Sequence, residues 1–547
     1  MLKSIELENF KAFGQRTTIP LAPITLIFGQ NSSGKSSILQ SLNLLKQSRE
    51  SRDADALLLP RAESGLTDLG SFHEMLFDHD EERQLRIRIE TIPDRRRLSG
   101  MMGRYSRDFD SVGLELMFSR KSAKDEISLD ELHLCNGGEQ QPIATYQKVD
   151  LPREMRRLAY GPARLNRHRN QANLRAVKCV SSNADSSYWA SAFNRITQEK
   201  ERLIRYLKEL LDSGSLDQPK SKNIDEYEEE QVEVERSGSP ASQKIKEFVA
   251  YLTDELTPDS YRLRMAEQQL GQYVALDGFI PIGAQFPESH FNLNGILLEG
   301  QRESRIGQDC MVDLGNATIF AGRQIDQTLA NLFPLGPFRK SPSRWYVFSG
   351  TTPQDVGFEG QSLPDLIFRK DDVRDEANEW LKRLDIGYEL RARSLGNPGS
   401  DLFELRLLDT RRKNGVEVGL SDVGFGISQI LPLIVQSLAA SDQIISIEQP
   451  EVHIHPRLQA DLGDLLIEAT KEPRRNQFLI ETHSEHLALR LQRRVREKQI
   501  APEDISILYV SRGENGSTVT QLRLDEDGDF MDDFPGGFFP ERLRELR

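Results

Sequence analysis

The hydrophobic pattern near the N-terminus changes period twice within about fifty residues. Residues 5–10 alternate between apolar and polar side chains, and residues 24–28 are almost continuously apolar, so each segment predicts a strand. Apolar residues then recur at helical spacing over 37–45, which predicts a helix. Two further alternating segments, 85–90 and 112–118, predict an antiparallel layer beside the first strands. We therefore expect an α/β lobe at residues 1–150.

The middle of the chain, residues 151–330, is more loosely patterned. Apolar residues near one face predict a helix over 192–211, and further helices are expected over 242–256 and 318–332. The polar and acidic segment 213–242 predicts a loop. We expect a helix-rich insertion in this part of the chain.

Regular alternation of strands and helices returns after residue 335. Predicted strands cover 401–408, 443–447, 476–480 and 505–510. Residues 420–436 predict a glycine-rich turn followed by a helix, and further predicted helices cover 457–469 and 486–495. Such alternation is typical of a mostly parallel sheet with helices on its faces. The predicted fold class is therefore α/β, with a C-terminal lobe at 331–510 and a short tail at 511–547.

Composition narrows the classes of function. The chain has 547 residues and a formal net charge of −14, so any nucleic-acid contact must use a local patch, for which the basic segment 153–178 is the candidate. Three cysteines, Cys135, Cys179 and Cys310, disfavour a disulfide framework or a cysteine-based zinc site. No apolar segment approaches the length of a membrane span, and residues 1–10 do not look like a secretory signal. We expect a soluble cytoplasmic protein without a membrane partner.

Residues 29–36 match the phosphate-binding pattern G-x-x-x-x-G-K-[ST] between a predicted strand and a predicted helix. In that setting Lys35 reaches the terminal phosphates and the Ser36 hydroxyl binds Mg²⁺, which predicts ATP and Mg²⁺ as cofactors. The predicted nucleotide-binding residues here are Gly29, Asn31, Ser33, Gly34, Lys35, Ser36 and Ser37.

Acidic residues and a histidine follow two of the later predicted strands. Glu448 ends the strand 443–447, and the first acid after such a strand is predicted to hold Mg²⁺ beside a phosphate loop. His483, after the strand 476–480, is a candidate to contact the γ-phosphate or the attacking water. His453 and His455 fit structural roles better, since their spacing matches no standard zinc motif.

A glycine-rich turn precedes the predicted helix within 420–436. Its small residues and exposed N–H groups predict a second anion-binding helix start. Two phosphate-binding ends in one chain suggest a homodimer, in which the turn of one chain covers the nucleotide held by the other. The candidate residues of this turn are Ser421, Gly424, Gly426 and Ser428.

Taken in order, these motifs resemble the ATP-binding-cassette-type ATPases of the RecF, structural-maintenance-of-chromosomes and overcoming-lysogenization-defect group. The similarity covers residues 1–120 and 335–510 and includes the N-terminal pattern over residues 5–13. Residues 335–346, 422–432 and 525–539 look like those of a bacterial subfamily that includes the ATPase subunits of Septu-type anti-phage systems, some of them retron-associated.

This resemblance implies an ABC-type P-loop ATPase head with Glu448 as the Walker B acid, His483 as the switch histidine and residues 421–429 as a signature acting across a dimer. Relatives carry a catalytic glutamate directly after the Walker B acid, where this chain has Gln449. A neutral amide is a poor general base, so we expect tight ATP binding and slow hydrolysis, with Glu451 as a candidate substitute.

Two functions remain open at this point. The first is an ATP-dependent scaffold or sensor in anti-phage defence, with a nuclease on a separate chain because only about 60 residues follow His483. Within those residues, the acidic segment 525–529 fits a turn better than a metal loop. The second is a RecF-like repair ATPase that binds DNA directly through 153–178.

Overall fold

The computed structural model describes residues 1–51, 57–62, 65–96, 98, 100–121, 126–150, 175–183, 185–213, 240–250, 253, 273–285, 310–397, 400–413, 415–533 and 535. The chain forms two compact units. Unit 1 comprises residues 1–93, 113–130 and 324–547, and unit 2 comprises 94–112 and 131–323. The sequence placed these boundaries near 151 and 330, whereas the division falls within strand β6 (Glu126–Asn136) and helix α7 (Cys310–Ala330).

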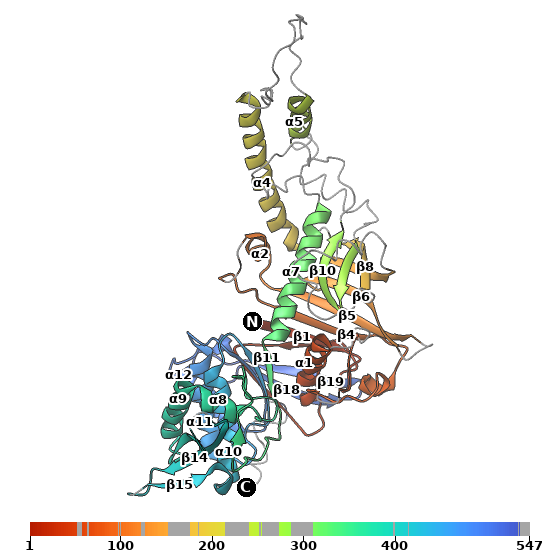
Figure 1. Ribbon diagram of the computed structural model, residues 1–547. Coiled ribbons are helices and arrows are strands. Elements are labelled where there is room, and N and C mark those ends of the chain that lie inside the picture. The colour runs from red at the N-terminus through yellow and green to blue at the C-terminus, as the bar shows by residue number, and fades with distance from the viewer. Residues whose placement is uncertain are drawn as a thin grey trace, which may run out of the picture. The chain divides into compact units, whose positions relative to one another are not determined.

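The central sheet of unit 1 joins the two ends of the chain (Figure 1). Its strand order is β11 (Leu332–Leu335), β16 (Ile444–Glu448), β17 (Gln477–Glu481), β3 (Ile24–Gly29), β18 (Ile505–Gly513) and β19 (Gly516–Leu522). All neighbours pair in parallel except β18 and β19. β3 is buried along its length because it lies between β17 and β18, which explains its continuous apolar run. The predicted mostly parallel sheet is therefore confirmed, and the segment 511–522 completes this sheet.

Strands of two further sheets belong to unit 1. The predicted antiparallel layer is confirmed, with the strand order β2 (Thr17–Pro20), β1 (Leu2–Glu8), β4 (Leu85–Thr91) and β5 (Val112–Lys121). A third sheet contains β12 (Tyr346–Val347), β14 (Leu402–Asp409) and β13 (Tyr388–Ser394), and β15 (Val416–Gly419) also pairs with β14.

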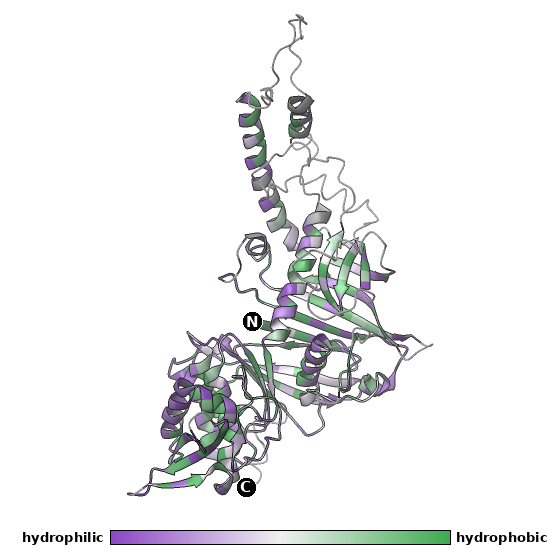
Figure 2. Ribbon diagram, viewed as in Figure 1, coloured by the Kyte–Doolittle hydropathy of each residue, from purple (hydrophilic) through white to green (hydrophobic). Residues whose placement is uncertain are grey.

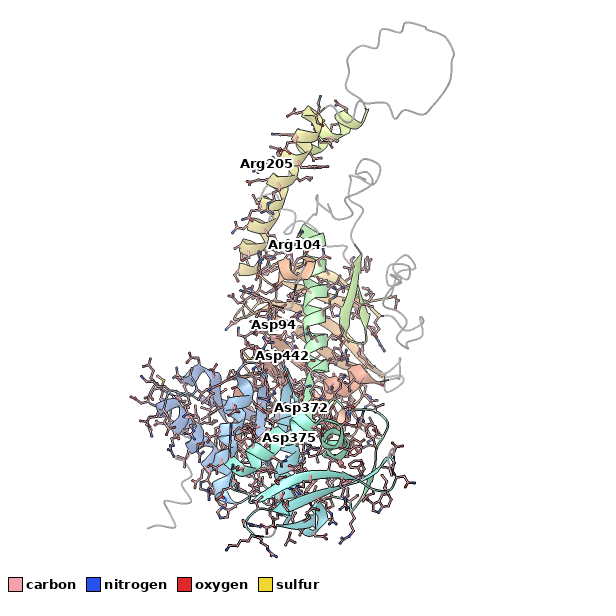
Figure 3. All side chains as sticks on the ribbon, turned by 60° about the vertical axis from the view of Figure 1, so that its left-hand side comes forward. Asp94, Arg104, Arg205, Asp372, Asp375 and Asp442 are labelled. Atoms are coloured by element: carbon pink, nitrogen blue, oxygen red, sulfur yellow. The ribbon has the colours of Figure 1, made fainter. Side chains whose placement is uncertain are left out.

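Helices pack on these sheets through their apolar sides. Helix α1 (Lys35–Glu50) follows β3 and contacts both β3 and β17. A second group lies beside the third sheet in Figure 1 and comprises α8 (Leu363–Arg369), α9 (Asp371–Arg383), α10 (Phe425–Ala439), α11 (Pro456–Thr470) and α12 (Glu485–Arg496). Of these, α9 places Asp372 and Asp375 at the surface and buries Val373 and Trp380 (Figure 3). The helical spacing of apolar residues predicted α10, α11 and α12, whereas α8 and α9 were not predicted.

Unit 2 contains strands as well as the predicted helices. Besides parts of β6 and α7, its described elements are α2 (Gly100–Tyr105), β7 (Ala144–Val149), β8 (Arg175–Ser182), α4 (Ser187–Asp212), α5 (Pro240–Ala250), β9 (Tyr273–Asp277) and β10 (Ile280–Gln285). The strands from β6 to β10 pair in chain order. In α4, hydrophobic and hydrophilic residues alternate along the helix (Figure 2), with Leu203 and Leu207 buried and Arg205 exposed (Figure 3).

A buried network of charged and hydroxyl groups lies in the core of unit 2. Arg195 donates through Nε to Asp108 at 2.7 Å and through Nη2 to both oxygens of Asp313 at 2.9 and 3.0 Å. The hydroxyl groups of Tyr105 and Tyr188 donate to the same Asp313 carboxylate at 3.0 and 2.7 Å. Asp313 is 1% exposed. We call these five residues the Asp313 network.

Candidate functional site

The phosphate loop has the predicted strand–loop–helix geometry. Gly29 and Gly34 have φ angles of +149° and +96°, in the region that favours glycine. A Cβ atom at Gly29 would lie 2.3 Å from the Val510 carbonyl oxygen, and one at Gly34 would lie 2.6 Å from the Ala12 Cβ. The two glycines are therefore required by both backbone conformation and space.

Lys35, the first residue of α1, folds back onto this loop. Its ammonium group donates to the carbonyl oxygens of Gly29 at 3.0 Å and Gln30 at 2.8 Å. Burial lowers the pKa of Lys35, although the nearby carboxylates of Glu481 and Glu451 oppose that shift. The loop lysine thus lies close to two acids from later strands.

Glu481 is the functional candidate that the sequence reasoning missed. It ends β17, is 3% exposed, and accepts a hydrogen bond from the Ser36 hydroxyl. Its other oxygen, Oε2, is buried without a hydrogen-bond partner in the described chain. Burial raises the pKa of Glu481, while Ser36 and Lys35 hold it down. The available signal was an acid that ends an apolar strand, the same signal that identified Glu448.

Glu448 lies at the end of β16, directly opposite Glu481 in the parallel register. Burial, together with the charge of Glu481, raises the pKa of Glu448 to about 7. The buried Arg339 opposes this shift, and its Nη1 donates to the Glu448 carbonyl oxygen at 3.5 Å. Burial in turn lowers the pKa of Arg339 to about 10, and its Nε has no hydrogen-bond partner in the described chain. No local pattern marked Arg339, because its partner is 109 residues away.

The residues after these two strands are held together by hydrogen bonds. The backbone N–H of Gln449 donates to the Glu481 carbonyl oxygen at 2.8 Å. The Glu451 carboxylate accepts from the Thr482 hydroxyl at 2.8 Å and from the His483 backbone N–H at 2.7 Å. His483 lies at the surface, and partial desolvation of its ring, together with the charge of Lys35, lowers its pKa. Glu451 thus links the two strand ends, and both of its oxygens are engaged.

The remaining predicted loop residues have different environments. Asn31 is exposed. Ser33 is buried, its hydroxyl has no hydrogen-bond partner in the described chain, and its carbonyl oxygen accepts from the Ser517 hydroxyl at 2.6 Å. The backbone N–H of Ser37 donates to the Gly34 carbonyl oxygen at 3.1 Å, which closes the first turn of α1.

The glycine turn leads into α10 as predicted. Ser421 and Gly424 are exposed, and nothing lies within 4 Å of a Cβ placed on Gly424. A Cβ on Gly426 would lie 2.7 Å from the His453 carbonyl oxygen, so this glycine permits close packing against the segment that follows Glu448. Ser428 is buried. The described contacts therefore tie this turn to the segment after β16, while the groups around Lys35 come from β3, α1 and the ends of β16 and β17.

Oxygen ligands in the site fit Mg²⁺. The Ser36 hydroxyl, the Glu481 carboxylate with its unpartnered oxygen, and Glu448 are hard donors of the kind that Mg²⁺ prefers. Across the described ranges, the ends of β16 and β17 included, no group of three or more His, Cys, Asp and Glu residues is arranged to hold a metal ion by itself.

Two segments that raised the question of metal binding have structural roles. The His455 ring accepts from the Arg457 N–H at 3.3 Å and caps α11. In the acidic segment 525–529, Asp525 Oδ1 accepts from the N–H groups of Asp527 at 3.0 Å and Asp529 at 2.9 Å. That segment is therefore a turn, as its glycine indicated.

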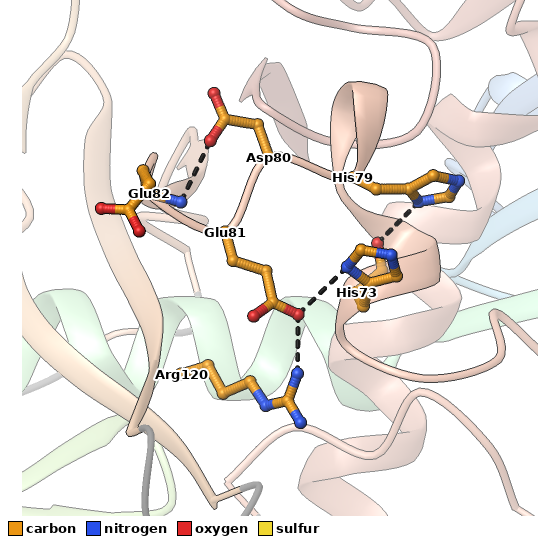
Figure 4. Close-up of a pocket in the computed structure, with 6 residues that line it drawn as sticks. All are labelled: His73, His79, Asp80, Glu81, Glu82 and Arg120. Carbon is orange, nitrogen blue, oxygen red and sulfur yellow. Dashed lines mark hydrogen bonds and ion pairs between the residues drawn. The ribbon is translucent and has the colours of Figure 1, made fainter.

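An open surface pocket of unit 1 lies on the segment that follows α1 (Figure 4). Glu81 accepts from Arg120 at 2.6 Å and pairs with His73 at 3.1 Å, and the rings of His73 and His79 stack at 4.6 Å. The Asn9 amide donates to backbone carbonyls of the same segment, at Asp80 and Arg83. Since Glu81 is already paired with Arg120 and His73, we assign no ligand to this pocket.

Two predicted surface segments fall mostly outside the described residues. Of the basic segment 153–178, only 175–178 is described, within β8. Of the acidic segment 213–242, residues 214–239 are not described. Among the described helices, none is long and apolar enough to cross a membrane.

Similar folds occur among solved structures, with low identity. One is the Smc head domain with an extended coiled coil bound to the C-terminal domain of ScpA, derived from Pyrococcus furiosus. The two sequences are 14% identical, the match covers 100% of this chain and 99% of that chain, and the TM-score is 0.37. Another is the SMC head domain from Thermotoga maritima, with 12% identity, 96% and 99% covered, and a TM-score of 0.35. At such low sequence identities and TM-scores, neither match says anything about the function of this chain. The comparison with curated proteins gave no significant match.

A family model matches the parts of the chain that build the site. Its two matched segments are residues 1–95, which hold the phosphate loop, and residues 365–488, which hold the glycine turn, Glu448, Glu481 and His483. The model describes an AAA ATPase domain. Over these two segments the chain is similar to that family, and the match supports an ATPase.

Proposed function

We propose that this chain binds ATP with Mg²⁺ at the phosphate loop and hydrolyses it slowly. The observation that carries the proposal is the arrangement around Lys35, where loop residues from the N-terminal segment meet Glu451, Glu481 and His483 from strand ends more than 400 residues later. Lys35 and the N–H groups at the start of α1 hold the phosphates. Ser36 and the strand-end acids hold Mg²⁺, which when bound neutralises charge on the β- and γ-phosphate oxygens.

Nucleotide binding is tested with a fluorescent ATP analogue and Lys35→Ala. Loss of the ammonium group removes a direct phosphate contact, so we expect a loss of affinity of about 10-fold or more. Lys382→Ala, on the exposed surface of α9, is the matched control and is expected to bind as the parent does. Equal affinity of Lys35→Ala and the parent would contradict the proposal.

Slow hydrolysis rests on the groups available to activate water. Gln449 is neutral, and both oxygens of Glu451 accept hydrogen bonds from residues 482 and 483. A Gln449→Glu variant adds a carboxylate and should hydrolyse ATP faster, by about 10²-fold if it serves as a general base. Steady-state phosphate release measures this difference. Turnover of several per second by the parent, or no gain in the variant, would contradict slow hydrolysis.

We propose further that two copies of the chain complete the site. Ser421 and Gly424 are exposed at the start of α10, where unpaired N–H groups attract anions. In a dimer that holds ATP, this helix start faces the nucleotide of the other copy. Light scattering with and without a non-hydrolysable ATP analogue tests this, and Gly424→Asp, which adds a negative charge there, is expected to prevent the ATP-dependent dimer.

For the cellular role, we propose an ATP-dependent scaffold or sensor in bacterial anti-phage defence that works with a separate nuclease. The motif resemblance over residues 335–346, 422–432 and 525–539 is the support for this role. The alternative is a RecF-like repair ATPase, which the basic segment 153–178 favours. Purification from the native gene context discriminates the two, since the first predicts an associated nuclease chain. The second predicts DNA binding that falls steeply with salt and is lost on neutralising Arg164, Arg167 and Arg169.

A further inference from the structure

The acids at the ends of β16 and β17 are not equivalent. Glu481 pairs in register with Glu448 on one side and with Ile27 of the phosphate-loop strand on the other. Glu448 is therefore one strand farther from the loop than Glu481. Because the carboxyl ends of parallel strands lie at one edge of the sheet, the strand next to β3 presents its last side chain nearest to Ser36.

The hydrogen bonds of the site separate the acids in the same way. Glu481 accepts from Ser36, and its Oε2 is the only carboxylate oxygen in the described chain that is buried without a hydrogen-bond partner. Both oxygens of Glu451 are engaged by residues 482 and 483. The positive charge of Arg339 lies near the Glu448 carboxylate, and the Arg339 guanidinium donates to the Glu448 backbone carbonyl oxygen.

A buried carboxylate oxygen without a donor is costly in the absence of a ligand. The Glu481 carboxylate accepts from a serine hydroxyl and is influenced by the charge of the loop lysine, which is the setting in which a divalent cation with bound phosphates would supply the missing partner. For Glu448, the positive charge of the buried Arg339 supplies such compensation from within the protein.

We propose that Glu481, together with Ser36, supplies the protein ligands of Mg²⁺, and that Glu448 acts from one strand farther out with Arg339 as its counter-ion. This inference rests on the proposed ATP binding. It differs from the sequence prediction, in which Glu448 was the metal-holding acid.

The test uses Mn²⁺, which takes oxygen ligands as Mg²⁺ does and has an electron paramagnetic resonance signal. Mn²⁺ affinity is measured on the full chain with a saturating non-hydrolysable ATP analogue, for the parent, Glu481→Gln, Glu448→Gln and Glu514→Gln. Loss of even an outer-shell partner weakens metal binding about 10- to 100-fold, so Glu481→Gln should lose at least about 10-fold. Glu448→Gln is expected to lose less than Glu481→Gln, and Glu514→Gln, at an exposed turn, is expected to match the parent.

Binding of the analogue in EDTA separates this inference from the one it rests on. The parent and Glu481→Gln should both bind the metal-free nucleotide, with the variant as tight or tighter because it lacks a negative charge beside the phosphates. No nucleotide binding by the parent, either in EDTA or with Mg²⁺ present, would overturn the proposed function itself. Normal nucleotide binding with a larger Mn²⁺ loss in Glu448→Gln than in Glu481→Gln would overturn only the role of Glu481.

A second pair of variants guards against misfolding. Glu481→Asp and Glu448→Asp keep the charge and shorten the side chain by one methylene. We expect weaker Mn²⁺ binding in Glu481→Asp and parent-like binding in Glu448→Asp, while the reverse order would overturn the assignment.

Discussion

The nucleotide site of unit 1 and the Asp313 network of unit 2 both bury charged residues, yet they treat them differently. In the Asp313 network, Arg195 has two carboxylate partners, and Asp313 accepts hydrogen bonds from one arginine and two tyrosine hydroxyls. In the nucleotide site, buried atoms of Ser33, Arg339 and Glu481 have no hydrogen-bond partner in the described chain. The charged groups of the Asp313 network are paired within the protein, whereas the nucleotide site contains buried polar atoms that a ligand could pair with.

We interpret this difference as one between a structural role for the Asp313 network and a binding role for the nucleotide site. A satisfied buried network stabilises one conformation and leaves little to offer a ligand. Buried polar groups without hydrogen-bond partners lower the stability of the ligand-free protein. A ligand that supplies those partners raises the stability again. The two regions should therefore respond in opposite directions when a charge is removed.

Asp313→Asn should give the largest loss of stability. It leaves Arg195 with one carboxylate and weakens two hydroxyl contacts, and breaking a buried pair of this kind costs about 3–5 kcal/mol. Chemical denaturation followed by a signal from Trp189, which is buried in unit 2, measures the loss. Asp185→Asn, exposed in the same unit, is the control and should change little. A loss below 1 kcal/mol for Asp313→Asn would remove the contrast between the two regions.

The second prediction concerns how the stability of unit 1 changes with pH in the nucleotide-free protein in EDTA. The pKa of Glu448 is raised from 4.5 to about 7, so the folded state keeps this proton longer than the unfolded chain does. The resulting stability is complete below about pH 4.5 and is lost as pH rises through about 7. We expect unit 1 to lose about 3 kcal/mol over that range. Glu448→Gln should flatten the profile, and an unchanged profile in that variant would assign the effect to other groups.

Glu481→Gln should change ligand-free stability by less and with the opposite sign to Asp313→Asn. The amide can still accept from Ser36 and no longer carries a buried charge, so we expect a gain of up to about 1 kcal/mol. Thermal unfolding without nucleotide gives the sign. A destabilisation as large as that of Asp313→Asn would mean that Glu481 has a structural role in the ligand-free protein.

The smallest effect is expected at an exposed ion pair in unit 1. Arg383 and Glu468 lie 2.8 Å apart with about half of each side chain exposed. Glu468→Gln should change stability by less than about 0.5 kcal/mol, because exposed pairs contribute little. The same measurement as for Glu481→Gln applies, and a larger effect would show that burial is not what sets the two regions apart.

The sequence predicted the parts of the site that are local. Strands β3, β16 and β17 are short apolar runs, and Lys35 and Ser36 follow from a pattern of eight residues. Glu481 was part of a recognised segment, but its importance depends on β17 lying between β3 and β16. Strand order is a property of the assembled sheet, so neither spacing nor hydropathy contained it.

The Asp313 network lay beyond sequence reasoning for the same reason. Asp108, Arg195 and Asp313 are separated by 87 and 118 residues, and each looks like an ordinary charged residue in its local sequence. The strands of unit 2 were likewise missed where short segments such as β9 and β10 lie between long polar stretches. β9 is recognised as a strand through its pairing with β8, which is distant in the sequence.

The contact between Ser33 and Ser517 has a consequence for how the protein is made. These two residues are 484 positions apart, and β3 has both of its neighbours, β17 and β18, in the last fifth of the chain. A ribosome adds about 5–20 residues per second, so β3 waits on the order of half a minute or more for its two neighbouring strands. During that interval the apolar strand β3 and its glycine loop lack their final neighbours on the nascent chain. We therefore expect chaperones to bind this segment during synthesis.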